Sequence, residues 1–294
     1  MGNKALQQAY KKKNDEFYTM MPDIETELAH YKEQFRGMVI YCNCDDWQKS
    51  NFVKYFVLHF DDIGIERLIA TGIGGRKFDM RRKGGRKFVT ISKLRGNGRF
   101  ESDECVALLK EADVVVTNPP FSQFVDYFRL LTTHNKQFII MGALTAVGRQ
   151  VVFEQIKAEK VRVTNNASSR TWFVTPEFDD DRGGQKLQAL GNICWYTTFV
   201  DVKPYGCLDL TASYSGNEGN YTACISFECI NVDRLKDIPS DYYGVMGVPI
   251  TYLTHVDKRF SISDMCGGHT KNLRYMRDGK EKLAFERVLI QRTA

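Results

Sequence analysis

Short apolar runs alternate with amphipathic segments through the first half of the chain. Apolar runs predict buried strands, and apolar residues spaced three or four positions apart predict helices. Strands are expected at residues 38–42, 66–71, 87–92, 113–117 and 137–141. Helices are expected at residues 50–60, 102–110 and 122–133, with Ser50 and Ser102 as N-caps of the first two. This alternation is typical of an α/β fold with a mostly parallel sheet.

The pattern changes beyond residue 160. Three further apolar segments, at residues 161–163, 171–174 and 193–202, predict strands without long helices between them. The remainder is mixed in pattern and rich in Tyr, Gly and Asp. We therefore expect a first domain over residues 1–205 and a C-terminal segment over residues 206–294.

Charge is distributed unevenly along the chain. The net charge is +5, but residues 72–99 hold ten basic residues and one acid, Asp79. This segment alone carries +9, so the remaining residues together carry −4. A dense basic segment in an otherwise acidic chain predicts a polyanionic partner.

The basic segment contains a repeat. Gly-Gly-Arg-Lys-Phe occurs at residues 74–78 and again at residues 84–88. Because glycine pairs give the backbone freedom, we expect a mobile loop between two strands, inserted in the first domain, that contacts phosphates. The residues expected to contact nucleic acid are Arg76, Lys77, Arg81, Arg82, Lys83, Arg86 and Lys87.

Asn118-Pro119-Pro120-Phe121 follows directly after the apolar run at 113–117. Parallel sheets bind ligands at the carboxyl ends of their strands, so this turn is the main candidate site. Asn118 offers a side-chain oxygen, Pro119 a carbonyl oxygen, and Phe121 a flat ring. Two such oxygens can accept both N–H bonds of a planar amine and direct its lone pair at a methyl donor. For these four residues alone, a rigid strand-to-helix turn is the alternative.

Several segments, in a fixed order, resemble the EcoRI-type adenine-specific DNA methyltransferase family. They are residues 16–19, 41–46, 50–56, 113–122, 194–198 and 241–253. The resemblance implies a Rossmann-like methyltransferase fold, with a mostly parallel seven-stranded sheet flanked by helices. It also implies a C-terminal segment that helps to recognise double-stranded DNA.

The resemblance further implies the reaction and its residues. S-adenosylmethionine would donate a methyl group to N6 of an adenine flipped out of the duplex, as in restriction–modification systems. The adenine would be held by Asn118, Pro119, Pro120 and Phe121. The cofactor would contact Phe17, Tyr18, Thr19, Tyr41, Asn43, Cys44, Asp45, Asp46 and Phe100.

One cofactor position departs from the family. The family resemblance implies an acid directly before the phenylalanine, which accepts a hydrogen bond from the adenine amine of the cofactor. Here Arg99 precedes Phe100, and a guanidinium cannot accept that bond. Asp103 and Glu104 are the candidates to replace the acid.

Other features limit the class of protein. No apolar stretch is long enough to span a membrane, and the first residues lack the apolar segment of a signal peptide. We therefore expect a cytoplasmic protein of bacterial, phage or mobile-element origin, with its eight cysteines reduced. The five histidines show no ligand spacing, so we expect no metal, and we expect a monomer.

Two alternative functions stay open at this point. The same acceptor groups also suit an adenine in RNA or a glutamine amide in a protein. A cofactor pocket without its acid, combined with an intact basic segment, would instead make a DNA-binding protein without methyltransferase activity.

Overall fold

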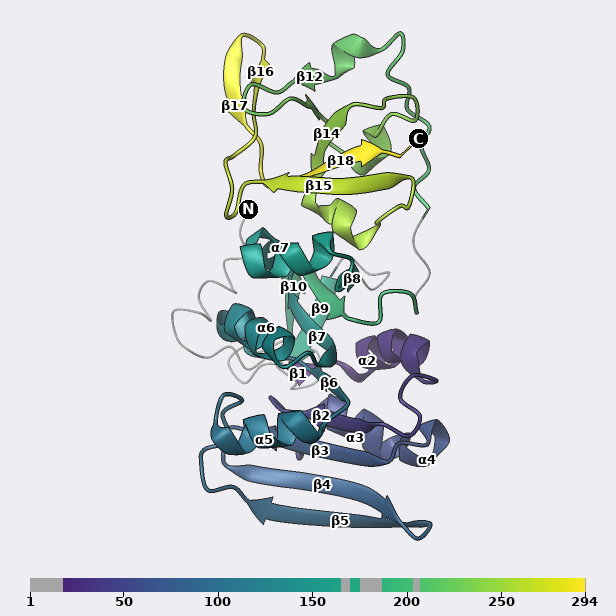
Figure 1. Cartoon of the computed structure of the whole chain (residues 1–294), viewed down its shortest axis with the longest axis vertical. Helices are drawn as coiled ribbons and strands as arrows, with labels where there is room; N and C mark the ends of the chain where they lie inside the picture. Colours follow the sequence, from purple (N-terminus) through teal and green to yellow (C-terminus); the bar gives the residue numbers. More distant parts are fainter. Residues whose placement is uncertain (1–17, 165–169, 175–186, 203–206, 294) are drawn as a thin grey trace. The chain divides into compact units, whose positions relative to one another are not determined.

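The apolar runs of the first half of the chain form the centre of a large mixed sheet (Figure 1). The computed structural model describes residues 18–164, 170–174, 187–202 and 207–293. The sheet has the strand order β5-β4-β3-β2-β6-β7-β11-β8. Its strands are β2 (Val39–Cys42), β3 (Arg67–Gly72), β4 (Arg76–Lys83), β5 (Arg86–Lys93), β6 (Val114–Thr117), β7 (Gln137–Ala143), β8 (Arg162–Thr164) and β11 (Ile193–Thr197).

The parallel part of the sheet comprises β3, β2, β6 and β7. Most residues of these strands are buried, because each strand is a short and mostly apolar run that helices cover on both faces. The predictions for these four strands are confirmed. The predicted α/β fold is confirmed. The predicted seven-stranded, mostly parallel sheet needs correction, since the described residues form eight strands and β4, β5 and β11 pair antiparallel to their neighbours.

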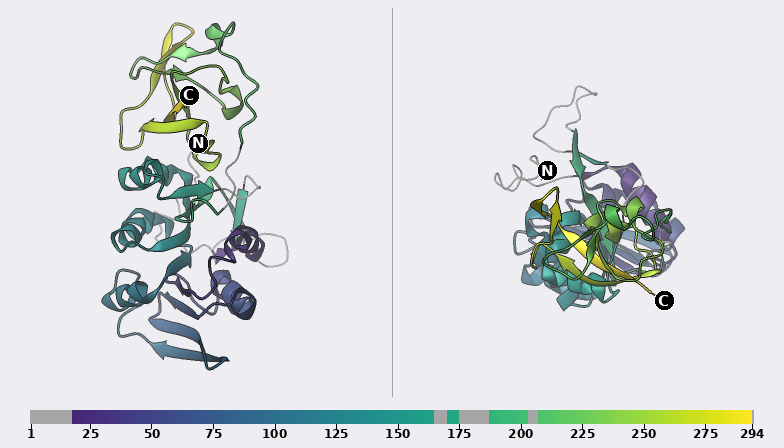
Figure 2. Two further views of the ribbon diagram at one scale, coloured as in Figure 1. Left: turned by 45° about the vertical axis from the view of Figure 1, so that its right-hand side comes forward. Right: turned by 90° about the horizontal axis from the view of Figure 1, so that it is seen from above.

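Helices flank this sheet on both faces (Figures 1 and 2). One face carries α2 (Met21–Leu28), α3 (Asn51–Leu58) and α4 (Phe60–Ile63). The other carries α5 (Asp103–Glu111) and α6 (Phe124–Thr133). Ser50 caps α3 by accepting the N–H of Phe52 at 3.1 Å, and Ser102 caps α5 by accepting the N–H of Cys105 at 3.4 Å. Both predicted caps are confirmed.

The repeat-containing basic segment is a β-hairpin and not the mobile loop that we predicted. Its strands β4 and β5 pair along their full length, from Arg76 opposite Lys93 to Lys83 opposite Arg86. Gly84 and Gly85 have φ of +55° and +76°, as a two-residue hairpin turn of type I′ requires. The second glycine pair therefore forms a tight turn.

The chain forms two compact units. The described residues 18–143, 170–174 and 187–202 belong to the first unit, and residues 144–164 and 207–293 belong to the second. The second unit resumes close to the predicted boundary at residue 205. It also takes in residues 144–164, which the sequence had suggested for the first domain.

Three smaller sheets contain the remaining described strands. In the first unit, β1 (Tyr18–Thr19), β9 (Arg170–Val174) and β10 (Leu187–Gly191) form an antiparallel sheet. The second unit contains α7 (Gln150–Lys157) and a sheet of β12 (Thr222–Ala223), β13 (Ile230–Asn231), β14 (Val245–Pro249), β18 (Arg287–Arg292) and β15 (Phe260–Cys266). A hairpin of β16 (Arg274–Arg277) and β17 (Lys280–Leu283) accompanies it.

None of the helices in the described residues is long and apolar enough to cross a membrane. Within the same residues, no cluster of three or more His, Cys, Asp or Glu side chains could hold a metal ion.

Candidate active site

The two sequence motifs that hold the candidate site residues meet at one edge of the sheet, where the carboxyl ends of its parallel strands lie. β2 runs into Asn43-Cys44-Asp45-Asp46, and β6 runs into Asn118-Pro119. The two strands are parallel neighbours, with Tyr41 opposite Val115. Their carboxyl ends therefore lie side by side, and we refer to this side of the sheet as the catalytic edge.

Asp45 joins the two motifs through hydrogen bonds. Its carboxylate is only 7% exposed. The Thr117 hydroxyl, at the end of β6, donates to Asp45 Oδ2, and the Ser50 hydroxyl donates to Oδ1 at 2.6 Å. The backbone N–H of Asp45 donates to the Thr71 carbonyl at 3.0 Å. One carboxylate thus ties β2 to the end of β6 and to the N-terminus of α3.

The environment of Asp45 changes its acidity. Burial raises the pKa of this carboxyl to about 6, against the opposing effect of the hydrogen bonds from Ser50 and Thr117. At neutral pH the group is mostly an anion, buried beside the turn that holds Asn118.

Asn43 is the second buried polar group at the end of β2. It is 1% exposed, and its Oδ1 accepts a hydrogen bond from the Tyr127 hydroxyl of α6. Its Nδ2 has no hydrogen-bond partner among the described residues. Burial raises the pKa of Tyr127 well above its usual range, so its hydroxyl stays protonated and keeps donating. Asn43 therefore has a donor left for a ligand.

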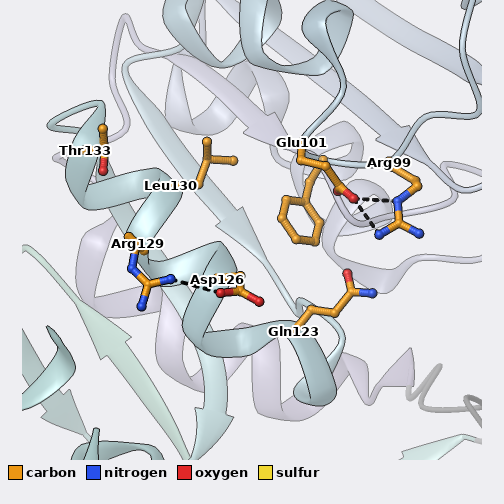
Figure 3. A pocket seen from close by; sticks show the side chains of 8 residues that line it. Arg99, Glu101, Gln123, Asp126, Arg129, Leu130 and Thr133 are labelled. Atoms are coloured by element: carbon orange, nitrogen blue, oxygen red, sulfur yellow. Dashed lines mark hydrogen bonds and ion pairs between the residues drawn. The ribbon is translucent and has the colours of Figure 1, made fainter. Parts of the chain in front are cut away.

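A hollow of about 450 Å³ opens between residues 99–101 and helix α6 (Figure 3). Phe100 lines it and meets the Tyr127 ring edge-to-face at 5.0 Å. The remaining lining residues are Arg99, Glu101, Gln123, Asp126, Arg129, Leu130 and Thr133. An aromatic wall with polar groups around it suits a planar heterocycle.

The acids that line the hollow are not the two that we expected. Glu104 accepts the Gly96 N–H at 2.9 Å, and neither it nor Asp103 lines the hollow. Glu101 and Asp126 do, and Glu101 also forms an ion pair with Arg99 at 2.5 Å. Sequence reasoning missed Asp126, whose position in the first turn of the helix after the Asn118 motif was the available signal.

The turn at Asn118 leaves one of its carbonyl oxygens without a hydrogen bond from the described part of the chain. Asn118 is half-buried and Pro119 is buried. The Pro120 carbonyl accepts the Gln123 N–H at 2.9 Å. The Pro119 carbonyl accepts no backbone or side-chain hydrogen bond from the described residues. The oxygen predicted to receive an amine is therefore available.

Phe121 is placed differently from an open stacking platform. Its ring is 4% exposed and packs edge-to-face on Phe173 of β9 at 6.1 Å. The stacking role of Phe121 stays a prediction.

Three other residues predicted to contact the cofactor lie in or just after β2 but do not line the hollow. The Tyr41 hydroxyl is buried within hydrogen-bond distance (2.7 Å) of the Thr71 hydroxyl. Cys44 is half-buried, and burial raises the pKa of its thiol. Asp46 is half-buried and accepts the Gln48 N–H at 3.0 Å. None of the three has a described contact with the hollow.

The N-terminal motif lies partly outside the described residues. Phe17 is not described, and of Tyr18 only the backbone is, paired with Val174. Thr19 is buried, and its carbonyl accepts a 2.8 Å hydrogen bond from Asn51 at the start of α3. This anchors the motif beside α3.

Comparison with known proteins decides the family. The sequence pattern of a family described as "Adenine-specific methyltransferase EcoRI" matches residues 5–87 and 76–291. The chain belongs to this family. Type II methyltransferase M.EcoRI of Escherichia coli is 38% identical over 85% of each chain. M.MpnI of Mycoplasma pneumoniae and M.MgeORF184P of Mycoplasma genitalium are 36% and 35% identical, over 87% of this chain and 84% of theirs.

A solved structure, YeaZ from Pseudomonas aeruginosa, aligns over 45% of this chain and 68% of its own with 9% identity. Its TM-score of 0.18 is too low to indicate a shared fold. Membership of the EcoRI methylase family thus rests on sequence, and it confirms the expected family and the expected class of enzyme.

Four of the seven basic residues predicted to bind DNA form ion pairs within the protein. Arg81 and Lys77 lie 2.7 and 3.7 Å from buried Asp79. Arg82 and Lys87 lie 2.7 and 2.6 Å from Asp61 of α4. The other three, Arg76, Lys83 and Arg86, are exposed and form no ion pair with a described residue.

Proposed function

We propose that the chain is a site-specific DNA methyltransferase that transfers a methyl group from S-adenosylmethionine to N6 of an adenine flipped out of the duplex. One observation carries this proposal. The Asp45–Thr117 hydrogen bond joins the candidate cofactor residues after β2 to the candidate amine acceptors after β6. Methyl transfer needs a donor and an acceptor held in contact, and adjacent parallel strands provide that.

The residues present fit S-adenosylmethionine. Asn43 Nδ2 is a buried donor without a described partner, which suits an oxygen of the cofactor. The Asp45 anion suits the positively charged α-amino group at the amino acid end of the cofactor. Phe100 and the carboxylates of Glu101 and Asp126 suit its adenine, because a carboxylate accepts a hydrogen bond from an amine. Bound S-adenosylmethionine supplies a methyl group on a positively charged sulfur.

Asn118 and Pro119 would act on the target adenine. The lone pair of its exocyclic nitrogen is delocalised into the ring, so the amine is a weak nucleophile. When Asn118 Oδ1 and the Pro119 carbonyl accept its two N–H bonds, the nitrogen is held toward tetrahedral geometry and its lone pair is localised. Both oxygens also stabilise the positive charge that develops on the nitrogen.

The test is methyl transfer to unmethylated genomic DNA from tritiated S-adenosylmethionine, with Asn118→Ala as the key variant. We expect label in N6-methyladenine, and a loss of kcat of about 100-fold or more in the variant, as for the removal of one transition-state hydrogen bond. The KM for S-adenosylmethionine should change little, because Asn118 acts on the adenine.

Other outcomes would point elsewhere. Label in RNA or in protein glutamine, with none in DNA, would replace the substrate and keep the chemistry. Salt-dependent DNA binding without label in any acceptor would favour the DNA-binding alternative. An equal thermal unfolding midpoint for wild type and Asn118→Ala would separate a catalytic effect from misfolding.

A further inference from the structure

The two ends of the β4–β5 hairpin lie at opposite edges of the sheet. β4 is antiparallel to β3, with Arg76 opposite Gly72 and Arg81 opposite Arg67. Because β3 is parallel to β2, its carboxyl end at Gly72 lies at the catalytic edge. Arg76 therefore lies at the catalytic edge, and the Gly84–Gly85 turn lies beyond the opposite edge. Figure 1 shows this turn on the side of α4, away from the end that leads into α5.

The residues of β5 are likewise distributed between the catalytic edge and the turn. Lys93 lies opposite Arg76 at the catalytic edge, and Arg86 lies opposite Lys83 at the turn. The seven residue steps of β4 span about 23 Å, at roughly 3.3 Å per residue. Three strand spacings of about 4.8 Å separate β4 from β6, so the catalytic end of the hairpin is about 14 Å from the Asn118 strand.

The segment after β5 is anchored at the catalytic edge as well. The Leu94 N–H donates to the Gly75 carbonyl at 2.7 Å, and the Gly74 N–H donates to the Asn97 carbonyl at 3.0 Å. Gly98 has φ of +81°, and a Cβ there would come within 2.1 Å of the Gly72 carbonyl oxygen. This packing keeps Arg95 next to Arg76 and Lys93.

The three cations at this end are available to a ligand. Arg76, Lys93 and Arg95 are exposed, and none forms an ion pair or a side-chain hydrogen bond with a described residue. Arg99 lies on the same segment but pairs with Glu101. Exposed, unpaired arginine and lysine side chains are the usual partners of DNA phosphates.

The geometry points to Arg76, Lys93 and Arg95 as the residues that contact phosphates of the duplex beside the flipped adenine, in place of the cations at the hairpin turn. A duplex that delivers an adenine to Asn118 must approach the catalytic edge. Lys83 and Arg86 lie a full strand length away at the other edge. The sequence predicts phosphate contacts for the segment from Arg76 to Arg95 as a whole, and neither Lys93 nor Arg95 is among the individual residues named there. This assignment rests on the proposed function.

The chain offers two matched pairs for the test, each with one lysine and one arginine. Lys93→Gln/Arg95→Gln removes two charges at the catalytic edge, and Lys83→Gln/Arg86→Gln removes two at the turn. The binding of a fluorescein-labelled DNA duplex is measured at several NaCl concentrations. Each lost phosphate contact lowers the slope of log K against log salt by about 0.9.

We expect the catalytic-edge pair to lose about 1.8 in slope and to bind on the order of 10-fold more weakly at low salt. Its KM for DNA should rise while its KM for S-adenosylmethionine stays unchanged. The turn pair should keep the wild-type slope. An equal or larger loss in the turn pair, or no loss in either pair, would overturn the assignment. Failure of the proposed function itself would differ, because wild type would then transfer no methyl group to DNA.

Discussion

At the scale of single residues, Asp45 combines two tasks. Its backbone and carboxylate bind to Thr71, Ser50 and Thr117, so it fixes the ends of three neighbouring strands relative to one another. It also remains an anion in a buried place, which is unfavourable unless a positive ligand arrives. The residue therefore costs stability in the free protein and favours binding of a cation.

This cost can be measured through its pH dependence. In the unfolded chain the pKa of an aspartate is near 3.9, whereas that of Asp45 is about 6 in the folded protein. Between these values the folded state binds a proton that the unfolded state does not. Folding stability should therefore increase as the pH falls from 7 to 4.5, by about 2 kcal/mol from this group.

The comparison needed is wild type against Asp45→Asn in urea unfolding at pH 7, 5.5 and 4.5. Other carboxylates titrate in both proteins, so the difference in unfolding free energy isolates Asp45. As the pH falls, the unfolding free energy of wild type should increase relative to that of Asp45→Asn. A difference that stays constant with pH would contradict the raised pKa.

At the scale of elements, one buried carboxylate holds the hairpin to the sheet. Asp79 of β4 is 1% exposed and lies 2.7 Å from both Arg67 of β3 and Arg81. Burial acts to raise its pKa, but the hydrogen bonds and charges of these guanidinium groups outweigh it and hold the value at about 2. Arg67 also reaches Glu111 of α5 at 2.6 Å.

We expect Asp79→Asn to destabilise the protein by about 3 kcal/mol, because it removes the buried counter-charge that Arg67 and Arg81 share and leaves Arg67 with Glu111 alone. Urea unfolding at pH 7 measures this. Asp61→Asn is the matched control, since Asp61 also binds two cations of the hairpin but is half-exposed. It should cost much less. Equal losses in the two variants would show that burial does not set the strength of these pairs.

The parallel strands were predictable from sequence, and the hairpin was only partly so. β2, β3, β6 and β7 are apolar runs whose burial matches their composition. The phenylalanines of the two Gly-Gly-Arg-Lys-Phe copies differ in burial, since Phe78 is buried against Trp47 while Phe88 is half-exposed. The register explains this, because Phe78 lies opposite Ile91 and Phe88 lies opposite Arg81, on the other face.

The site was predictable to a similar extent. Asn118 and Asp45 could be placed at one edge because each directly follows a predicted strand. Thr117 and Asp126 could not be given roles, because these depend on a neighbouring strand and on the direction of a helix. Arg95 could not be singled out within the basic segment, because charge density along the chain does not reveal which edge of a sheet a residue reaches.

At the scale of the whole molecule, the chain contributes to the second unit twice. Residues 144–164 belong to it although the described residues 170–174 and 187–202 do not. Phe153 of α7 is buried, with its ring 6.2 Å from that of His269, and His269 Nδ1 lies 2.9 Å from the Gly148 carbonyl oxygen. A Cβ at Gly268 would come within 2.4 Å of that same oxygen. The early segment is thus packed into the later one.

A chain that ends at residue 202 should therefore not fold into a stable domain. It would retain α7 but lose His269 and Gly268, which pack around Phe153 and Gly148. We expect this truncated chain to aggregate or to bind a hydrophobic dye, and to unfold without a cooperative transition. Size-exclusion chromatography, dye fluorescence and thermal melting measure these properties. A monomer with a sharp melting transition would contradict the expectation.

β5 is the outermost strand of the sheet, and its unpaired side affects how the protein behaves at high concentration. β5 ends the sheet, and it exposes Phe88, Val89 and Ile91 by 50, 54 and 49%. A bare edge with apolar side chains is a template for pairing with another copy. Arg86, Lys87 and Lys93 lie on the same strand, and their mutual repulsion opposes such pairing. Salt screens this repulsion, so self-association through β5 is favoured under the conditions that release DNA.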